Sequence, residues 1–229
     1  SLLNVLGLTL AFVAFYIIAS QVWFTLTYNH SLKDADRTYL ISPNFGGEKG
    51  DMKWSSNSPG DLAYVAAEQF PDAEEVASYA PYSAINRIWV KKSEYNFESF
   101  NDQIFYATPN LPSFFGFECL AGDFNELKNP NTVIMSRSEA EKLGLGVGDV
   151  IYLEGGRMFD DGKPTVQKTI VAIYEDMPKN SIFGHWSIVQ GDEQVHTSGN
   201  NNWNYTNFVR MRKGADLTTY IEIFKKGYA

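Results

Sequence analysis

The sequence predicts an α+β protein in which one long apolar helix precedes a mixed domain of strands and short helices. Residues 1–26 contain no Asp, Glu, Lys or Arg, and the first of these charged residues is Lys33. The remaining part, about two hundred residues, begins and ends with strand–helix patterns and is rich in strand patterns between them. We therefore expect an α/β part that is split in the sequence and carries an inserted β-rich part.

The first segment, residues 1–28, has the length and composition of a transmembrane helix. Roughly 20 apolar residues, with about 1.5 Å of rise each, cross the ~30 Å hydrocarbon layer of a bilayer. Apolar side chains point in all directions from this helix, whereas a helix on a soluble core keeps one polar face. Two alternatives stay open: a cleaved secretory signal, although no basic residue precedes the run, and a buried helix of a soluble protein.

The charge of the remaining part limits the partners that it can bind. The chain has 27 acidic and 19 basic residues, and its net charge is −8. Such a domain is repelled by nucleic acid and by anionic lipid surfaces, so nucleic-acid binding is not expected. Cys119 is the only cysteine, which excludes an internal disulfide and a multi-cysteine zinc site. We expect a folded domain that is stabilised by its core alone.

The first strand–helix–strand unit follows the apolar helix. Residues 37–42 are β-favouring and predict a strand. A helix is expected to begin behind Ser58 as its cap, with Pro59 in the first helical position, and to end before Pro71. Residues 76–90 predict extended chain that is interrupted at Pro81 and most strand-like from Ile85 onward.

The middle of the chain is β-rich. Ser136 and Glu139 have capping-box spacing and predict a short helix that ends at Leu143. The other expected elements are extended chain over 95–106, a short apolar turn or helix over 111–117, a strand over 131–135, and paired strands over 149–153 and 166–174 joined by a turn at Asp161-Gly162.

The last part repeats the strand–helix order. Residues 192–204 are polar and predict a surface loop, and a strand is expected over 205–211. A helix behind Asp216 is indicated by apolar residues on one face: Leu217, Tyr220, Ile221 and Phe224.

Two glycine-rich stretches resemble nucleotide-binding loops only superficially. Residues 144–148 (GLGVG) follow a helix and lead into a strand, which is the reverse of the order in a dinucleotide site, so we interpret them as a helix-ending turn. The stretch 156–164 is one residue too long for a phosphate loop, and Pro164 stands where Ser or Thr is required. No cofactor is expected.

Catalytic and metal-binding side chains are also few. Cys119 lies in a mostly apolar run, where a buried thiol is usually inert. The histidines have no ligand spacing, and Glu74-Glu75 fit surface charges better than an acid–base pair. The remaining aromatic candidates for a cleft or for core packing are Trp54, Trp89, Trp186 and Trp203. We expect no enzyme, and neither a catalytic nor a metal site.

Short motifs in order along nearly the whole chain resemble MacB/FtsX-like ABC transporter permeases. The motifs are Asn4-Val5-Leu6-Gly7-Leu8 within the apolar helix, residues 35–39 (ADRTY), 70–74 (FPDAE), 114–117 (FFGF) with 120–123 (LAGD), 131–136 (NTVIMS), 175–181 (EDMPKNS), and 207–210 (NFVR) with 214–216 (GAD).

The resemblance implies a permease with four transmembrane helices and a large extracytoplasmic domain between the first and the second. That domain has a porter-like α/β part and an inserted β-rich part in such proteins. We accordingly assign residues 1–28 to the transmembrane helix, 29–94 and 205–229 to the porter-like subdomain, and 95–204 to the inserted subdomain.

The resemblance further implies a mechanotransmitter of the bacterial inner membrane, with its main domain in the periplasm. ATP hydrolysis by an ABC ATPase, on a separate chain or outside this fragment, would move the domains of a homodimer or permease heterodimer to export or extract periplasmic substrates. Membrane lipid is the other implied partner. The mechanical link would be the first helix, with candidate residues Asn4, Gly7, Phe12, Phe15, Ile18 and Trp23.

Two alternatives to a permease stay open. A ligand-binding sensor ectodomain of a membrane signalling receptor would pass motion through the same helix. An anchored hydrolase would need a catalytic set, which the sequence does not show.

Overall fold

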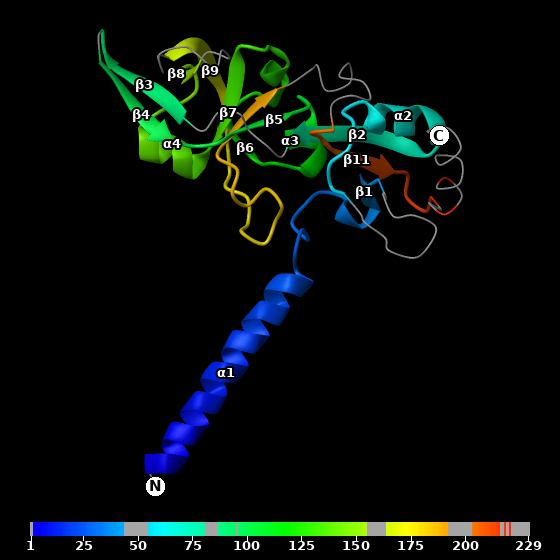
Figure 1. The fold of residues 1–229 in the computed structure, drawn as a ribbon, viewed down its shortest axis with the longest axis vertical. Helices are drawn as coiled ribbons and strands as arrows, with labels where there is room; N and C mark the ends of the chain where they lie inside the picture. Colours follow the sequence, from blue (N-terminus) through cyan, green and yellow to red (C-terminus); the bar gives the residue numbers. More distant parts are fainter. Residues whose placement is uncertain are drawn as a thin grey trace.

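The computed structural model describes residues 2–43, 55–80, 87–94, 96–154, 164–191 and 203–215, together with Thr218 and Tyr220. The first helix, α1 (Leu2–Leu26), stands out from the rest of the molecule as a straight rod (Figure 1). Its side chains are exposed all round, apart from a half-buried Ala19. At about 1.5 Å per residue the helix is roughly 37 Å long, which is enough to cross a bilayer. The predicted apolar helix is confirmed.

The domain above α1 is built on one mixed sheet. Among the described residues the sheet has 11 strands in the order β1-β11-β2-β5-β10-β7-β9-β8-β3-β4, with β6 paired to β9. The strands are β1 (Thr38–Ile41), β2 (Ala73–Ala80), β3 (Arg87–Ser93), β4 (Asn96–Asn101), β5 (Ile104–Ala107), β6 (Cys119–Gly122), β7 (Thr132–Ser136), β8 (Val150–Glu154), β9 (Pro164–Tyr174), β10 (Ile188–Gly191) and β11 (Thr206–Met211). The helices besides α1 are α2 (Leu62–Gln69), α3 (Leu111–Phe115), α4 (Arg137–Leu143) and the 3₁₀ turns η1 (Ala35–Arg37) and η2 (Phe124–Lys128). The predicted α+β class is confirmed.

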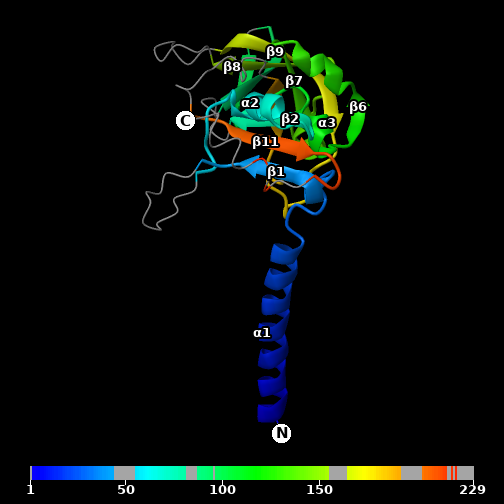
Figure 2. The same ribbon diagram turned by 90° about the vertical axis from the view of Figure 1, so that its right-hand side faces the viewer.

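Strands from the two ends of the chain form the smaller part of the sheet. Strand β11 lies between β1 and β2 and is antiparallel to both. Helix α2 packs on these strands through Ala66 and Phe70, which contact Val209 and Met211. Figure 2 shows β1 and β11 as the strands nearest to the end of α1. Strands from both ends of the chain therefore meet in one part of the sheet.

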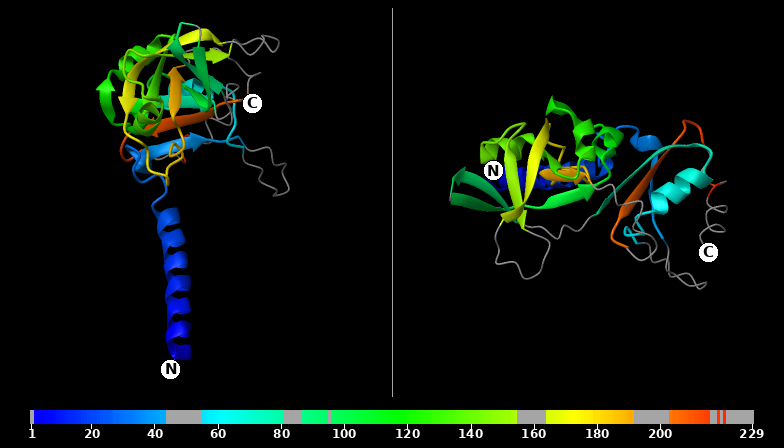
Figure 3. Two further views of the ribbon diagram at one scale, coloured as in Figure 1. Left: turned by 90° about the vertical axis from the view of Figure 1, so that its left-hand side faces the viewer. Right: turned by 90° about the horizontal axis from the view of Figure 1, so that it is seen from above.

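The larger part of the sheet has its own core. Strands β7 and β9 are parallel, and β10 runs parallel to β5 but antiparallel to β7. Its apolar cluster includes Ile88, Ile104, Val133, Ile151 and Ile170, all fully buried. The two parts lie side by side when the domain is seen from above (Figure 3). Among the described residues they are joined in the sheet by two residue pairs between β2 and β5, Tyr79 with Ala107 and Ala80 with Tyr106.

The pairing of β3 bears on where the inserted part begins. We expected the boundary at residue 94, but β3 pairs with β4 and with β8, both of which lie in the inserted stretch. The division of the chain stays a prediction, and this pairing favours a boundary before Arg87.

The start of α2 differs from the prediction. The helix begins at Leu62 with Asp61 in the N-cap position, and no side chain caps it. Ser58 instead pairs with Tyr205 through a backbone hydrogen bond of 2.8 Å and accepts a 2.7 Å hydrogen bond from the buried Asn207. Because the buried amide needs this partner, the hydroxyl is engaged before the helix starts. Pro59 therefore lies ahead of the helix.

Helix α4 follows the prediction at both ends. The Ser136 hydroxyl accepts from the N–H of Glu139 at 3.4 Å, and Gly144 ends the helix with φ 68°. The Glu139 carboxylate pairs with Lys142 at 2.9 Å, so only one side of the expected capping box is described. Residues 144–148 are thus a helix-ending turn, as the sequence indicates.

Several predicted segments lie wholly or partly outside the described residues. They include the Asp161-Gly162 turn, most of the loops over 43–57 and 192–204, and most of the last helix. Thr218 and Tyr220 are helical, and the Tyr220 ring lies 5.3 Å from the ring of Phe70.

Two glycines in left-handed conformations give a matched test of the contact between β6 and β9. A Cβ on Gly122 (φ 82°) would lie 2.0 Å from the Val171 carbonyl oxygen, whereas a Cβ on Gly148 (φ 93°) would meet nothing within 4 Å. We expect Gly148→Ala to cost about 1–2 kcal/mol of unfolding free energy from backbone strain. Gly122→Ala should cost about 1–3 kcal/mol more, because β6 and β9 must separate. Urea unfolding followed by tryptophan fluorescence measures both, and equal losses would contradict the described β6–β9 contact.

Candidate functional site

The predicted link residues all lie along α1. Phe12, Phe15, Ile18 and Trp23 are 63–71% exposed, and Asn4 and Gly7 are exposed as well. The described structure brings none of the six against the domain. Their role in a mechanical link stays a prediction. The hydroxyl groups of the helix bond to carbonyl oxygens of the preceding turn, as Thr9 does to Val5 at 2.8 Å, and this satisfies them without water.

A hydrogen-bonded joint begins at the first residue after α1. The Asn180 side-chain amide donates to the carbonyl oxygen and the hydroxyl of Thr27 at 3.1 and 2.9 Å. The Asn29 N–H donates to the Asn180 carbonyl oxygen at 2.8 Å. The Asn29 side-chain oxygen accepts from the N–H of Ile182 at 2.9 Å. The β9–β10 loop (residues 175–187) is therefore fixed to the end of the helix at both Thr27 and Asn29.

Asn29 has the backbone conformation that such a joint needs. Its φ is 63°, in the left-handed region where Asn is tolerated better than most residues. Asn29 lies in the turn that follows α1, three residues beyond its end, and a left-handed residue there turns the chain away from the helix axis. Here that turn aims the Asn29 side chain at the loop and directs Leu32 into the domain core, where it is 6% exposed.

A second contact fixes the other side of the joint. The Lys33 N–H donates to the Phe115 carbonyl oxygen at 3.0 Å. Gly116 has φ 73°, and a Cβ on it would lie 2.8 Å from the Cβ of Lys33. The helix exit thus rests directly on the backbone at the end of α3.

Ion pairs tie the next residues to the smaller part of the sheet. Asp34 lies 3.0 Å from Arg37 and 3.6 Å from Arg210, and Arg37 also pairs with Glu74. Arg210, whose side chain is 4% exposed, pairs with Glu75 at 3.0 Å. Glu74 and Glu75 are therefore partners in separate ion pairs.

The guanidinium of Arg210 is held on its other sides by α3. It lies 4.1 Å from the centre of the Phe114 ring and donates to the Phe114 carbonyl oxygen. A cation against an aromatic face in a buried setting is held more strongly than an exposed one. Through Asp34 and Phe114, Arg210 connects the segment that leaves α1 with β11 and α3.

The charges at the joint shift the pKa of one carboxyl. The hydrogen bond from Arg37 lowers the pKa of Asp34 below its ordinary value of 3.8, against partial desolvation, and the positive charges of Arg37, Arg210 and Lys33 lower it further. The same partnership raises the pKa of Arg37. Asp34 is therefore ionised wherever the folded protein works near neutral pH.

An aromatic cluster lies directly behind the joint and spans both parts of the sheet. Its members are Tyr79 of β2, Phe208 of β11, Phe105 of β5, Phe115 of α3, and Phe183 and Trp186 of the β9–β10 loop. Trp186 stacks on Phe105 at 4.5 Å, and Phe183 lies 4.7 Å from both Trp186 and Phe115. The loop that binds the helix end thus also inserts two aromatic rings between the parts.

The whole chain was compared with known proteins. Residues 1–226 match the family of the MacB-like periplasmic core domain. The chain belongs to this family.

Two solved structures share the fold of this MacB-like periplasmic core domain. A domain assigned to a permease protein from Porphyromonas gingivalis is 19% identical, with a TM-score of 0.66, over 85% of this chain and 86% of that chain. The periplasmic region of MacB from Actinobacillus actinomycetemcomitans is 9% identical, with a TM-score of 0.58, over 87% and 85% of the two chains. A comparison with curated proteins finds none that matches. The family and the apolar helix fit a membrane protein with a periplasmic domain.

Sequence reasoning found the motif at the joint but not its role. The stretch 175–181 was noted only as a family resemblance, and the structure places its Asn180 on the helix end. An Asn just beyond a helix was the available signal, since Asn is favoured in left-handed positions after helices. The ion pairs of Arg210 were not predictable, because its partners are distant in sequence.

The other sequence candidates form no reactive site in the described part of the chain. Cys119 is exposed, contrary to the prediction of a buried thiol, because β6 lies at the surface on β9. Desolvation by neighbouring atoms raises its pKa, which keeps the thiol protonated. No group of three potential metal ligands occurs among the described residues. Trp89 and Trp186 are core residues, 7% and 5% exposed, while Trp203 is exposed and Trp54 lies outside the described part.

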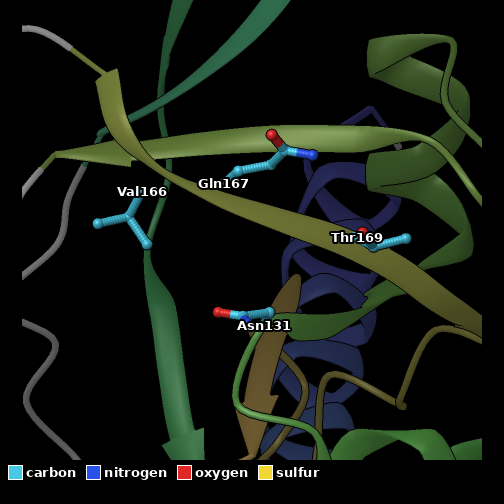
Figure 4. Close-up of a pocket in the computed structure, with 4 residues that line it drawn as sticks. All are labelled: Asn131, Val166, Gln167 and Thr169. Atoms are coloured by element: carbon cyan, nitrogen blue, oxygen red, sulfur yellow. The ribbon is translucent and has the colours of Figure 1, made fainter.

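A pocket of about 420 Å³ opens beside β9 (Figure 4). It is lined by Asn131, Val166, Gln167 and Thr169. None of these four described side chains is an acid, a base or an activated nucleophile.

A pair of substitutions at Asn29 separates its backbone role from its hydrogen bond. Asn29→Gly keeps the left-handed conformation and removes the acceptor of the Ile182 N–H, so hydrogen exchange at Ile182 should become faster. Asn29→Ala should add about 1–2 kcal/mol of destabilisation from strain. Hydrogen–deuterium exchange and urea unfolding measure the two effects. Unchanged protection of Ile182 in both variants would contradict the joint.

The Asp34 carboxyl gives the joint a pH dependence with a defined sign. Because its pKa is lower in the folded than in the unfolded state, its contribution is fully present above the ordinary value of 3.8 and is lost as the pH falls through the folded pKa. The acid-induced loss of stability from about pH 5 to pH 2 should therefore be shallower in Asp34→Asn than in the parent protein. Asp36→Asn, at an exposed neighbour, is the control and should leave the slope unchanged.

Proposed function

We propose that this protein transmits motion across the bacterial inner membrane as part of a MacB/FtsX-type ABC permease. In this proposal α1 spans the membrane and the domain stands in the periplasm. An ABC ATPase, on another chain or in a part outside this fragment, drives the motion. The domain itself performs no enzymatic step, and the motion exports or extracts periplasmic substrates.

The joint is the observation that carries the proposal. A helix can pass a displacement to a domain only if its end does not pivot freely. Here Thr27, Asn29 and Lys33 are all hydrogen-bonded to the domain within a few residues of the helix end, and Leu32 is buried in its core. Each such hydrogen bond contributes about 1 kcal/mol net, so several acting together make free rotation costly.

The fold also supports a response of the domain to that displacement. The β9–β10 loop binds the helix end and carries Phe183 and Trp186 into the cluster between the two parts of the sheet. In the described part of the chain the sheet connection between these parts has two residue pairs. We propose that movement of α1 changes the angle between two parts of the domain. One is the porter-like part, residues 29–94 and 205–229, and the other is the inserted part, residues 95–204. The first boundary between them is moved from residue 94 to before Arg87.

The family match favours a permease over a sensor ectodomain, which would share the same joint. Two copies, or this chain and a related permease chain, would act together in the assembled transporter. Along α1, residues Asn4, Gly7, Phe12, Phe15, Ile18 and Trp23 are exposed and would contact lipid or neighbouring helices of the transporter.

Loosening the joint tests this function directly. The double substitution Asn29→Gly/Asn180→Ala removes three side-chain hydrogen bonds between the helix end and the loop. In the complete transporter, reconstituted with its ATPase, we expect ATP hydrolysis to persist while substrate movement falls by roughly tenfold or more, given about 1 kcal/mol for each bond.

The matched control is Asn101→Ala, at an exposed position of β4, which should leave both activities unchanged. Transport at the parental rate in the loosened variant would contradict motion transfer through the joint.

A further inference from the structure

The end of α1 carries the residues that mark a membrane surface. Trp23 is 71% exposed, Phe24 44% and Tyr28 42%. Trp and Tyr favour the level of the lipid headgroups, because one part of each ring is apolar and another forms hydrogen bonds. About 20 apolar residues precede this level, which matches the thickness of the hydrocarbon layer. If α1 spans the membrane, the bilayer surface therefore lies near residues 23–28.

No spacer separates this level from the domain. The Asn180 amide already binds Thr27, one residue beyond the end of α1. In Figures 1 and 3 the β9–β10 loop, drawn in gold, descends from the sheet to the end of the helix. The headgroup region adds about 5–8 Å on each side of the hydrocarbon core. The tip of the loop must then lie within the headgroup layer.

The side chains at this level have the chemistry to bind headgroup phosphates. Lys179 at the tip of the loop and Lys33 after the helix are both exposed. The carboxylates of the loop are already engaged, because Glu175 pairs with Arg137 at 2.7 Å and Asp176 accepts from Ser138 at 2.9 Å. Asp34 is likewise paired, while Asp36 of the same segment is exposed.

We propose that Lys33 and Lys179 bind phospholipid phosphates and seat the domain on the membrane surface beside α1. The inference rests on the proposed membrane placement of α1 and adds a contact surface on the domain. The net charge of −8 does not prevent this binding. Charges more than about 10 Å from the lipid phosphates are screened in physiological salt, whereas these two lysines lie among the phosphates. The domain then contacts the lipid surface next to the joint.

Spin labels on the full-length protein test this placement. Single cysteines replace Phe12, Ser31, Pro178 and Ser99 in a Cys119→Ser background without other cysteines, and each is labelled in vesicles of phosphatidylethanolamine and phosphatidylglycerol. Ser31, Pro178 and Ser99 are exposed, and Ser99 is on β4, the strand at the opposite end of the sheet from β1, which Figure 1 shows above the level of the helix end. Collisions with oxygen report lipid exposure, and collisions with a water-soluble nickel chelate report water exposure.

We expect a clear order of positions. The label at Phe12 should be reached by oxygen and not by the chelate, and the label at Ser99 by the chelate. The labels at Ser31 and Pro178 should show a loss of chelate collisions relative to Ser99. If the labels at Ser31 and Pro178 collide with the chelate as often as the label at Ser99 while Phe12 lies in lipid, the contact of the domain with the membrane surface is overturned. The membrane span of α1 would still stand. A water-exposed Phe12 would overturn both.

The role of the lysines is tested in the same vesicles. Lys33→Gln/Lys179→Gln should raise chelate collisions at Pro178 toward the value at Ser99, because each lysine near an anionic surface changes the docking equilibrium by roughly fivefold. The matched control Lys91→Gln/Lys128→Gln alters two exposed lysines elsewhere and should leave Pro178 protected. Unchanged protection in the first double variant would overturn phosphate binding by Lys33 and Lys179.

Discussion

The hydrogen bonds between the end of α1 and the β9–β10 loop are the constraint on which the rest of the structure depends. Asn29 and Asn180 each act as donor and acceptor across this contact, through backbone and side chain together. A single hydrogen bond would leave the helix free to rotate about it. Bonds at both Thr27 and Asn29, with Leu32 inserted into the core, define one direction for the helix relative to the domain.

The domain is arranged around that contact. The loop that holds the helix is also the loop that packs Phe183 and Trp186 between the two parts of the sheet. The ion pairs of Asp34 with Arg37 and Arg210 bind the same segment to β11. In the proposed function, a force on α1 would reach the junction of the two parts through these packed side chains.

Local signals in the sequence predicted most elements and the family. The apolar helix, the cap at Ser136 and the turn at Gly144 depend on neighbours in the sequence, and all three are confirmed. Ser58 was assigned wrongly as a cap because its real partners, Tyr205 and Asn207, are distant in the chain. The joint escaped prediction for the same reason, since Asn180 meets Thr27 only in the folded protein.

The central claim is that the joint holds α1 in one direction and prevents it from pivoting beneath the domain. Labels at Ile18 of α1 and Ser99 of β4, in the full-length protein in lipid nanodiscs, allow their separation to be measured by double electron–electron resonance. The account predicts one narrow distance distribution in the parent protein, and a broad one when Asn29 and Asn180 lose their side-chain hydrogen bonds. A broad distribution in the parent protein would contradict it, because the helix would then pivot freely beneath the domain.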